Sequence, residues 1–220
     1  MTVAAAGKHT LLEKPLAIDV ETCHRILAAA AAAGVVFAVA ENAQFIPDVV
    51  KAKELIEQGT IGDVYFAHAN LWESTIDSDF AGGFAQGWRN DPAQSGGGNT
   101  LDGGTHWVRA LRVWMGEIES VVAVNEHPLA SMAGESLTQA IVRFSSGKSA
   151  SFHCLVMDAP LSKQPFFRIQ GSKGELVLEG SFEGGLRLVT AESGPDGTPV
   201  ESDPSGRGRR GFLHSCVAHS

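Results

Sequence analysis

An aspartate and a histidine lie four residues apart at the end of a glycine-rich stretch. Asp102 and His106 follow the glycines at 96–98, and residues at this spacing share one face of a helix. Imidazole ionises near neutral pH, so the pair suits general acid–base catalysis. Glycines let a backbone approach a ligand closely, which predicts proton transfer beside a bound small molecule. The structural alternative makes Asp102 a helix cap and His106 a half-buried side chain.

A lysine follows a short apolar segment near the N-terminus. Residues 9–13 are expected to form a strand that ends in Glu13-Lys14-Pro15. Pro15 prevents the strand from continuing and biases Lys14 towards an extended conformation. The ammonium group should therefore lie at the edge of the sheet, where open α/β sheets bind ligands. The alternative for Lys14 is a solvated side chain at a strand end.

Four segments, in chain order, resemble motifs of the Gfo/Idh/MocA family of NAD(P)-dependent sugar and cyclitol oxidoreductases. The similarity runs from about residue 5 to about residue 180, and four ordered matches are more specific than any one. The matching segments are Glu13-Lys14-Pro15, the stretch from Glu41 to Phe45 with its following helix, Trp88-Arg89, and the glycines with Asp102 and His106.

The resemblance implies an α/β fold with two domains: a Rossmann domain followed by an α/β domain with a large, mostly antiparallel open sheet. It implies Lys14, Asp102 and His106 as catalytic residues. His106 would take the hydroxyl proton as hydride leaves for the nicotinamide. Lys14 would hydrogen-bond the substrate oxygen, and Asp102 would bind a neighbouring hydroxyl or orient the other two residues.

The resemblance also implies a cofactor, NAD or NADP, and a small-molecule polyol substrate, which would be a sugar, a cyclitol or a dihydrodiol. No metal is expected, because the three cysteines and eight histidines lack ligand spacing. The residues implied to contact the cofactor are Glu13, Lys14, Pro15, Asn42, Gln44, Trp88 and Arg89.

The family begins with a strand, a G-x-G-x-x-G turn and a helix that together hold the pyrophosphate. The residues before Glu13 contain no such unit, and the chain stops before the family's late helices. We therefore expect a chain truncated at the N-terminus and at the C-terminus, which is inactive alone. One alternative is a non-catalytic relative that acts only in binding or oligomerisation. A cofactor-independent hydrolase or lyase is disfavoured, because the other motifs would then be coincidences.

Hydrophobic periodicity predicts the elements that position these residues. We expect a remnant of the dinucleotide-binding domain over 1–60, a substrate and oligomerisation domain over 61–190, and a loop with a truncated tail over 191–220. The helix carrying His106 should bury Trp107, Leu111 and Trp114. The expected helices are 19–33, 47–58 and 105–114; the expected strands are 9–13, 35–40, 64–72, 121–124, 139–144, 149–155, 167–171 and 175–178; and residues 73–98 and 191–210 are expected to be loops.

Composition narrows the choice of partners and of compartment. A net charge of −8 argues against a nucleic-acid surface, which needs a clustered basic excess. No apolar stretch is long enough to span a membrane, and no signal layout begins the chain. We expect a cytoplasmic protein that forms a homo-oligomer through its open sheet, because truncation would leave one face of that sheet exposed.

Overall fold

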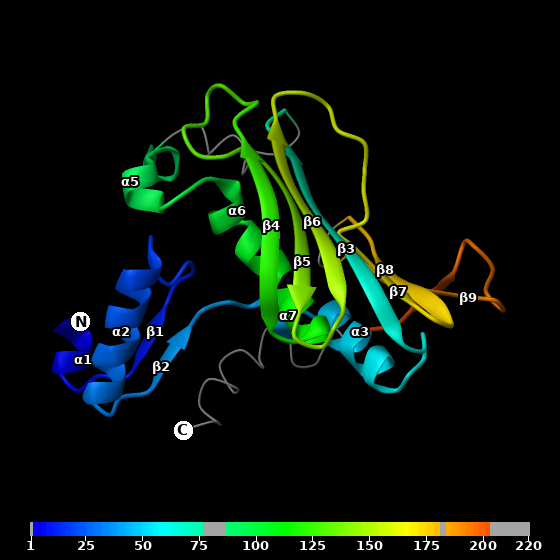
Figure 1. The fold of residues 1–220 in the computed structure, drawn as a ribbon, viewed down its shortest axis with the longest axis horizontal. Helices are drawn as coiled ribbons and strands as arrows, with labels where there is room; N and C mark the ends of the chain where they lie inside the picture. The colour runs from blue at the N-terminus through cyan, green and yellow to red at the C-terminus, as the bar shows by residue number, and fades with distance from the viewer. Residues whose placement is uncertain (1, 77–86, 181–183, 203–220) are drawn as a thin grey trace.

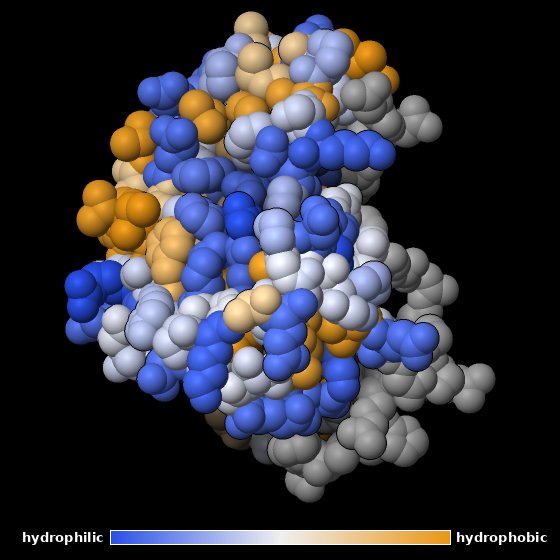
Figure 2. All heavy atoms as spheres, turned by 90° about the vertical axis from the view of Figure 1, so that its right-hand side faces the viewer, coloured by the Kyte–Doolittle hydropathy of each residue, from blue (hydrophilic) through white to orange (hydrophobic). Residues whose placement is uncertain are grey.

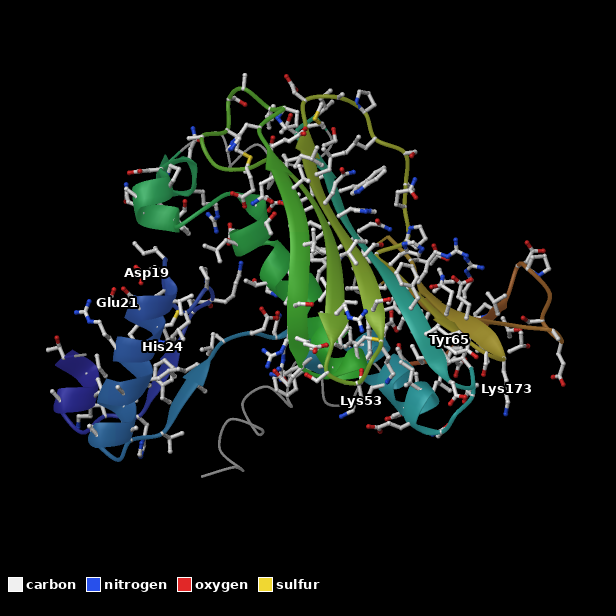
Figure 3. All side chains as sticks on the ribbon, viewed as in Figure 1. Asp19, Glu21, His24, Lys53, Tyr65 and Lys173 are labelled. Atoms are coloured by element: carbon white, nitrogen blue, oxygen red, sulfur yellow. The ribbon has the colours of Figure 1, made fainter. Side chains whose placement is uncertain are left out.

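The computed structural model describes residues 2–76, 87–180 and 184–202, and it places two sheets side by side (Figure 1). A small N-terminal unit holds a two-stranded parallel sheet in which Leu12 lies opposite Val39. Asp19 caps the second helix by accepting a hydrogen bond from the Thr22 amide at 2.6 Å, and Figure 3 labels it at the start of that helix. The elements of this unit are α1 (Thr2–Ala5), β1 (Thr10–Leu12), α2 (Val20–Ala32) and β2 (Phe37–Val39).

The larger unit is built on an eight-stranded sheet in the order β10-β9-β8-β7-β3-β6-β5-β4. Only the β3–β6 pair is parallel, so the sheet is mostly antiparallel, as expected. The strands are β3 (Val64–Ser74), β4 (Ile118–Glu126), β5 (Leu137–Phe144), β6 (Ser149–Met157), β7 (Phe167–Gly171), β8 (Gly174–Leu178), β9 (Leu186–Thr190) and β10 (Thr198–Val200).

Helices cover one face of this sheet and form the core with it. α7 (Gly104–Met115) lies against β3 and β6, and α3 (Pro47–Glu57) packs on α7. The predicted stripe of Trp107, Leu111 and Trp114 is buried, with at most 5% of any of the three exposed. The Trp107 indole N–H donates to the Asn70 carbonyl at 2.9 Å, and that of Trp114 donates to the Val49 carbonyl at 3.0 Å. These two hydrogen bonds tie α7 to β3 and to α3.

Two segments that were expected to be loops contain regular structure. Residues 73–98 include the end of β3, a 3₁₀ helix η3 (Gly87–Asn90) and α5 (Pro92–Ser95); residues 77–86 lie outside the described part. Asp91 caps α5 through the Ala93 amide at 3.0 Å, and Gly96 ends it with a φ of +82°. β10 lies within the segment 191–210, where pairing with β9 overrides a turn-rich composition.

The other face of the sheet carries exposed apolar side chains near the β4 edge. Val122 is 77% exposed, Val124 56% and Ile141 54%, and Val122 lies opposite Ile141 in the β4–β5 ladder. Figure 2 views the molecule from the β9 side. Hydrophobic residues gather at its left margin and at its top, and the rest of this surface is mostly hydrophilic. In the described ranges, no helix combines the length and apolar character that a membrane crossing requires.

Candidate active site

The C-terminal ends of β1 and β2 deliver two charged side chains to one edge. The strands are parallel and in register, so the residues that follow them, Lys14 and Glu41, emerge on the same side. α6 (Asn99–Asp102) and α7 face this edge from the larger unit (Figure 1). The predicted residues Lys14, Asp102 and His106 are thus brought together from segments far apart in the sequence.

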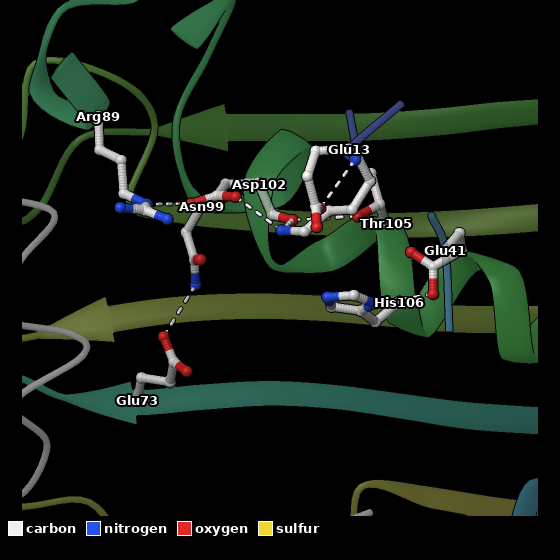
Figure 4. A network of polar contacts seen from close by, with 9 residues as sticks. Glu13, Glu41, Glu73, Arg89, Asn99, Asp102, Thr105 and His106 are labelled. Carbon is white, nitrogen blue, oxygen red and sulfur yellow. Dashed lines mark hydrogen bonds and ion pairs between the residues drawn. The ribbon is translucent and has the colours of Figure 1, made fainter. Parts of the chain in front are cut away.

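Asp102 is bonded to two cations. The Lys14 ammonium donates to Asp102 Oδ1 and to the Asp102 carbonyl, each at 2.7 Å, and Arg89 Nε donates to Oδ2 at 2.8 Å (Figure 4). Burial alone would raise the pKa of Asp102, which is 7% exposed, but the hydrogen bonds and charges of Lys14 and Arg89 bring that pKa below its ordinary value. Asp102 is therefore ionised at neutral pH.

His106 is oriented by Glu41. Its Nδ1 lies 2.8 Å from Glu41 Oε1, which also accepts from the Ala43 amide at 2.8 Å. Burial would raise the pKa of Glu41, but these hydrogen bonds, together with the charge of Lys14, lower it. A carboxylate can only accept, so Nδ1 carries the hydrogen and Nε2 is the proton-accepting ring nitrogen.

Asp102 and His106 lie in different helices and have different partners. Asp102 ends α6, whereas His106 lies in α7 and bonds Glu41. The alternative in which Asp102 caps a helix is wrong, because Gly103 occupies the N-cap of α7 and no side chain caps it. His106 is half-buried, as that alternative held, but a carboxylate holds its ring.

The glycine run packs closely against other segments of the chain. A Cβ at Gly96 would lie 2.7 Å from the Ile18 carbonyl oxygen, and one at Gly98 would lie 2.1 Å from the Glu135 carbonyl oxygen. The close approach is therefore to the chain's own backbone. The small glycines let the start of α6 lie against the backbone at Ile18 and Glu135. This contact sets the position of Asp102 at the end of α6.

The residues predicted to contact a cofactor are spread around the same edge. Glu13 is exposed and accepts from the Lys14 amide at 3.2 Å, and the peptide bond between Lys14 and Pro15 is cis. Asn42 is also exposed. The Gln44 side-chain oxygen accepts from Arg109, whose Nε lies at 3.1 Å.

Trp88 and Arg89 form a stacked pair beside Asp102. The Arg89 guanidinium carbon lies 4.6 Å from the Trp88 ring centroid, and Trp88 is 47% exposed. Arg89 thus has a partner that the sequence did not predict, namely the Asp102 carboxylate. The cofactor contacts of both residues remain predictions.

Sequence reasoning missed three polar residues of this site. Glu41 carried a signal, because it follows the strand expected at 35–40 and parallel strands end at a common edge. Asn99 and Glu73 carried none, since they are 26 positions apart and meet only in the folded chain, where the Asn99 amide donates to Glu73 Oε2 at 3.3 Å.

Comparison with known proteins places the chain among oxidoreductases. Residues 49–177, more than half of the chain, match the family model of the GFO/IDH/MocA C-terminal domain, and residues 1–41 match that of the oxidoreductase family with an NAD-binding Rossmann fold. The 1,5-anhydro-D-fructose reductase of Ensifer adhaerens is 31% identical over 80% of this chain and 52% of its own length. The levoglucosan dehydrogenase of Pseudarthrobacter phenanthrenivorans is 26% identical over 89% of this chain and 55% of its own.

Solved structures show the same fold. Levoglucosan dehydrogenase in complex with NADH and levoglucosan superposes with a TM-score of 0.76 at 26% identity, over 91% of this chain and 56% of that chain. An oxidoreductase from Thermotoga maritima gives a TM-score of 0.75 at 27% identity, over 91% and 57%. The chain spans about half the length of the curated relatives that it matches.

Proposed function

Because this chain belongs to the GFO/IDH/MocA family of oxidoreductases, we propose that it supplies the catalytic residues of an enzyme transferring a hydride between NAD or NADP and a CH–OH group of a small polyol. The observation that carries the proposal is the convergence of Lys14, Asp102 and His106 at the carboxyl edge of the parallel strands. Relatives named for levoglucosan and for 1,5-anhydro-D-fructose support a sugar as the substrate.

The residues present fit the nicotinamide end of the cofactor. Glu41 Oε2 is buried without a hydrogen-bond partner among the described residues, and an unsatisfied acceptor suits the carboxamide donor of a nicotinamide. Lys14, Asn42 and Trp88 would complete this end of the site. The nicotinamide ring, when bound, would supply the hydride acceptor or donor.

The chain's own residues move the proton. His106 Nε2 accepts it from the substrate hydroxyl, while Glu41 holds the ring through Nδ1. Lys14 has three N–H donors, two of which go to Asp102, so among the described residues the third is left for the substrate oxygen. Asp102 keeps that ammonium in place and stays charged.

Residues 1–60 would be the C-terminal remnant of a dinucleotide-binding Rossmann domain, 61–190 the substrate and oligomerisation domain, and 191–220 a loop and truncated tail. We expect no turnover by these 220 residues alone, because the pyrophosphate would lack the amide donors of a G-x-G-x-x-G turn. The alternative is a non-catalytic protein that acts only in binding or oligomerisation.

Calorimetric titration with NAD(H) and NADP(H) tests the proposal. It compares the 220-residue chain with a form extended upstream, if the gene encodes a G-x-G-x-x-G turn there. Binding only to the extended form supports a dehydrogenase that needs both parts. Absence of binding to either form favours the non-catalytic alternative.

Substitution of His106 tests the assigned proton acceptor. In the form extended upstream, His106→Ala should lower kcat at least about 100-fold, the usual contribution of a general base, and should leave cofactor affinity within about threefold. His24→Ala, at an exposed position of α2 labelled in Figure 3, is the matched control and should leave both unchanged. Full activity of His106→Ala would remove His106 from the mechanism.

A further inference from the structure

Glu73 is a largely buried carboxyl group that the proposed mechanism does not use. It lies near the end of β3 and points towards α6, where Asn99 donates to its Oε2 at 3.3 Å (Figure 4). Asn99 itself is fully buried, and its backbone is fixed by hydrogen bonds to Glu135 and Gly103. Glu73 is therefore held by a fixed side chain from the helix that carries Asp102.

The local charges make this position costly for a carboxylate. Burial raises the pKa of Glu73, the hydrogen bond from Asn99 lowers it, and the negative charge of Asp102 raises it again, with a net increase over the ordinary value. Lys14 and Arg89, two cations of the candidate site, are bonded to Asp102. A neutral amide is the partner that the described residues give Glu73, and a buried carboxylate is stable only with further hydrogen bonds.

A cavity beside Glu73 gives a ligand access to it. The cavity has a volume of about 620 Å³ and opens where β7 stops short of the end of β3. Its lining combines an aromatic ring with hydrogen-bonding side chains, including Trp72, Glu73, Gln164 and Glu179. Glu73 thus belongs both to this cavity and, through Asn99, to the helix of the catalytic network.

We propose that Glu73 is a substrate-binding residue that accepts a hydrogen bond from a hydroxyl group away from the reacting carbon, and that it selects neutral polyols over sugar acids. Asn99 is the positioning residue that aims the carboxyl group. A hydroxyl donor would add a hydrogen bond to the one from Asn99, whereas the carboxylate of a sugar acid would face Glu73 and Asp102 together. The inference rests on the proposed function for the identity of the substrate.

The experiment measures affinity and turnover separately. D-Xylose, a neutral sugar, and D-glucuronate, a sugar acid, are titrated calorimetrically into protein loaded with NADH. If neither the 220-residue chain nor the form extended upstream binds NADH, the two sugars are titrated into the 220-residue chain alone. Glu73→Gln keeps an acceptor for Asn99 but removes the charge, and Glu175→Gln is the matched control. Glu175 is a carboxyl group on β8 of the same sheet, where it bonds Arg168 and Gln170.

Glu73→Gln should weaken D-xylose binding, and raise KM, by about 10- to 100-fold, as for the loss of a hydrogen bond to a charged group. Its kcat should stay within about threefold, its melting temperature should be unchanged, and its preference for D-xylose over D-glucuronate should narrow. Glu175→Gln should match the wild type. Equal sugar affinities of Glu73→Gln and wild type, or no binding of D-xylose by the wild type, would overturn the assignment.

The same measurements separate this inference from the proposed function. If the wild type binds D-xylose but oxidises it with neither NAD nor NADP, the oxidoreductase proposal fails for this sugar. A weaker affinity in Glu73→Gln would then still establish Glu73 as a sugar-binding residue.

Discussion

At the scale of single residues, the site is a set of charges that fix one another. Asp102 forms ion pairs with Lys14, which follows β1, and with Arg89 in η3. Glu41 fixes the tautomer of His106. Each carboxylate is partly buried, so it is stable in the ionised form only because donors surround it. The geometry of the candidate site therefore depends on the ionisation of Asp102 and Glu41.

Asp102 should contribute stability that depends on pH. Its folded-state pKa lies below the ordinary value of 3.8, so its contribution is present above that value and is lost as pH falls through the folded pKa. Asp102→Asn should cost roughly 1–3 kcal/mol near pH 7, as for hydrogen bonds to charged groups. The difference from the wild type should shrink below about pH 4.

Urea unfolding at pH 7 and at pH 3 measures the free energy of unfolding of the wild type and of Asp102→Asn at each pH. Asp63→Asn is the same chemical change at an exposed position, and it should alter the free energy of unfolding little. A wild-type advantage over Asp102→Asn that is as large at pH 3 as at pH 7 would contradict the assigned ion pairs.

At the scale of elements, short helices and close contacts position the side chains of the candidate site. α6 has only four residues and gains its position from packing rather than from its own helical stability. Gly98 rests on the backbone of Glu135, with its amide donating to Glu135 Oε2 at 2.6 Å. Asp102 lies one turn further along, so a shift of this contact would move the carboxylate away from Lys14.

Gly98→Ala should therefore destabilise the protein and impair the site together. The new Cβ would lie 2.1 Å from the Glu135 carbonyl oxygen, and overpacking of this kind costs roughly 1–3 kcal/mol. Gly97→Ala is the control, because its Cβ would meet nothing closer than 3.5 Å. Thermal melts should show a lower midpoint for Gly98→Ala alone; equal midpoints would show that α6 can shift without cost.

At the scale of the whole molecule, the described helices cover one face of the large sheet. Helices α3, α6 and α7 bury the core face, while Val122, Val124 and Ile141 stay exposed on the other. Apolar side chains gathered on a sheet face favour association. We propose that two or more copies associate through this face, which would leave the candidate site at the opposite side of the sheet accessible.

Val122→Glu should weaken that association. A charge at a residue that is 77% exposed in the monomer costs little there but would be buried between copies. Val20→Glu makes the same change at a valine that is 69% exposed on α2 and should not alter association. Sedimentation velocity measures the mass of each variant, and a wild type that sediments as a monomer at all concentrations would refute the interface.

Local patterns in the sequence predicted the longer helices and most strands, whereas α5, α6, β9 and β10 were not predicted. Patterns of period two and 3.6 located β7 and the buried stripe of α7, and Glu13-Lys14-Pro15 with Asp102 and His106 identified the residues at the site. The sequence could not pair Lys14 with Asp102, His106 with Glu41 or Asn99 with Glu73, because those partners lie 88, 65 and 26 positions apart. Strand pairing and helix packing decide such contacts, and periodicity records only which face is buried, not what lies against it.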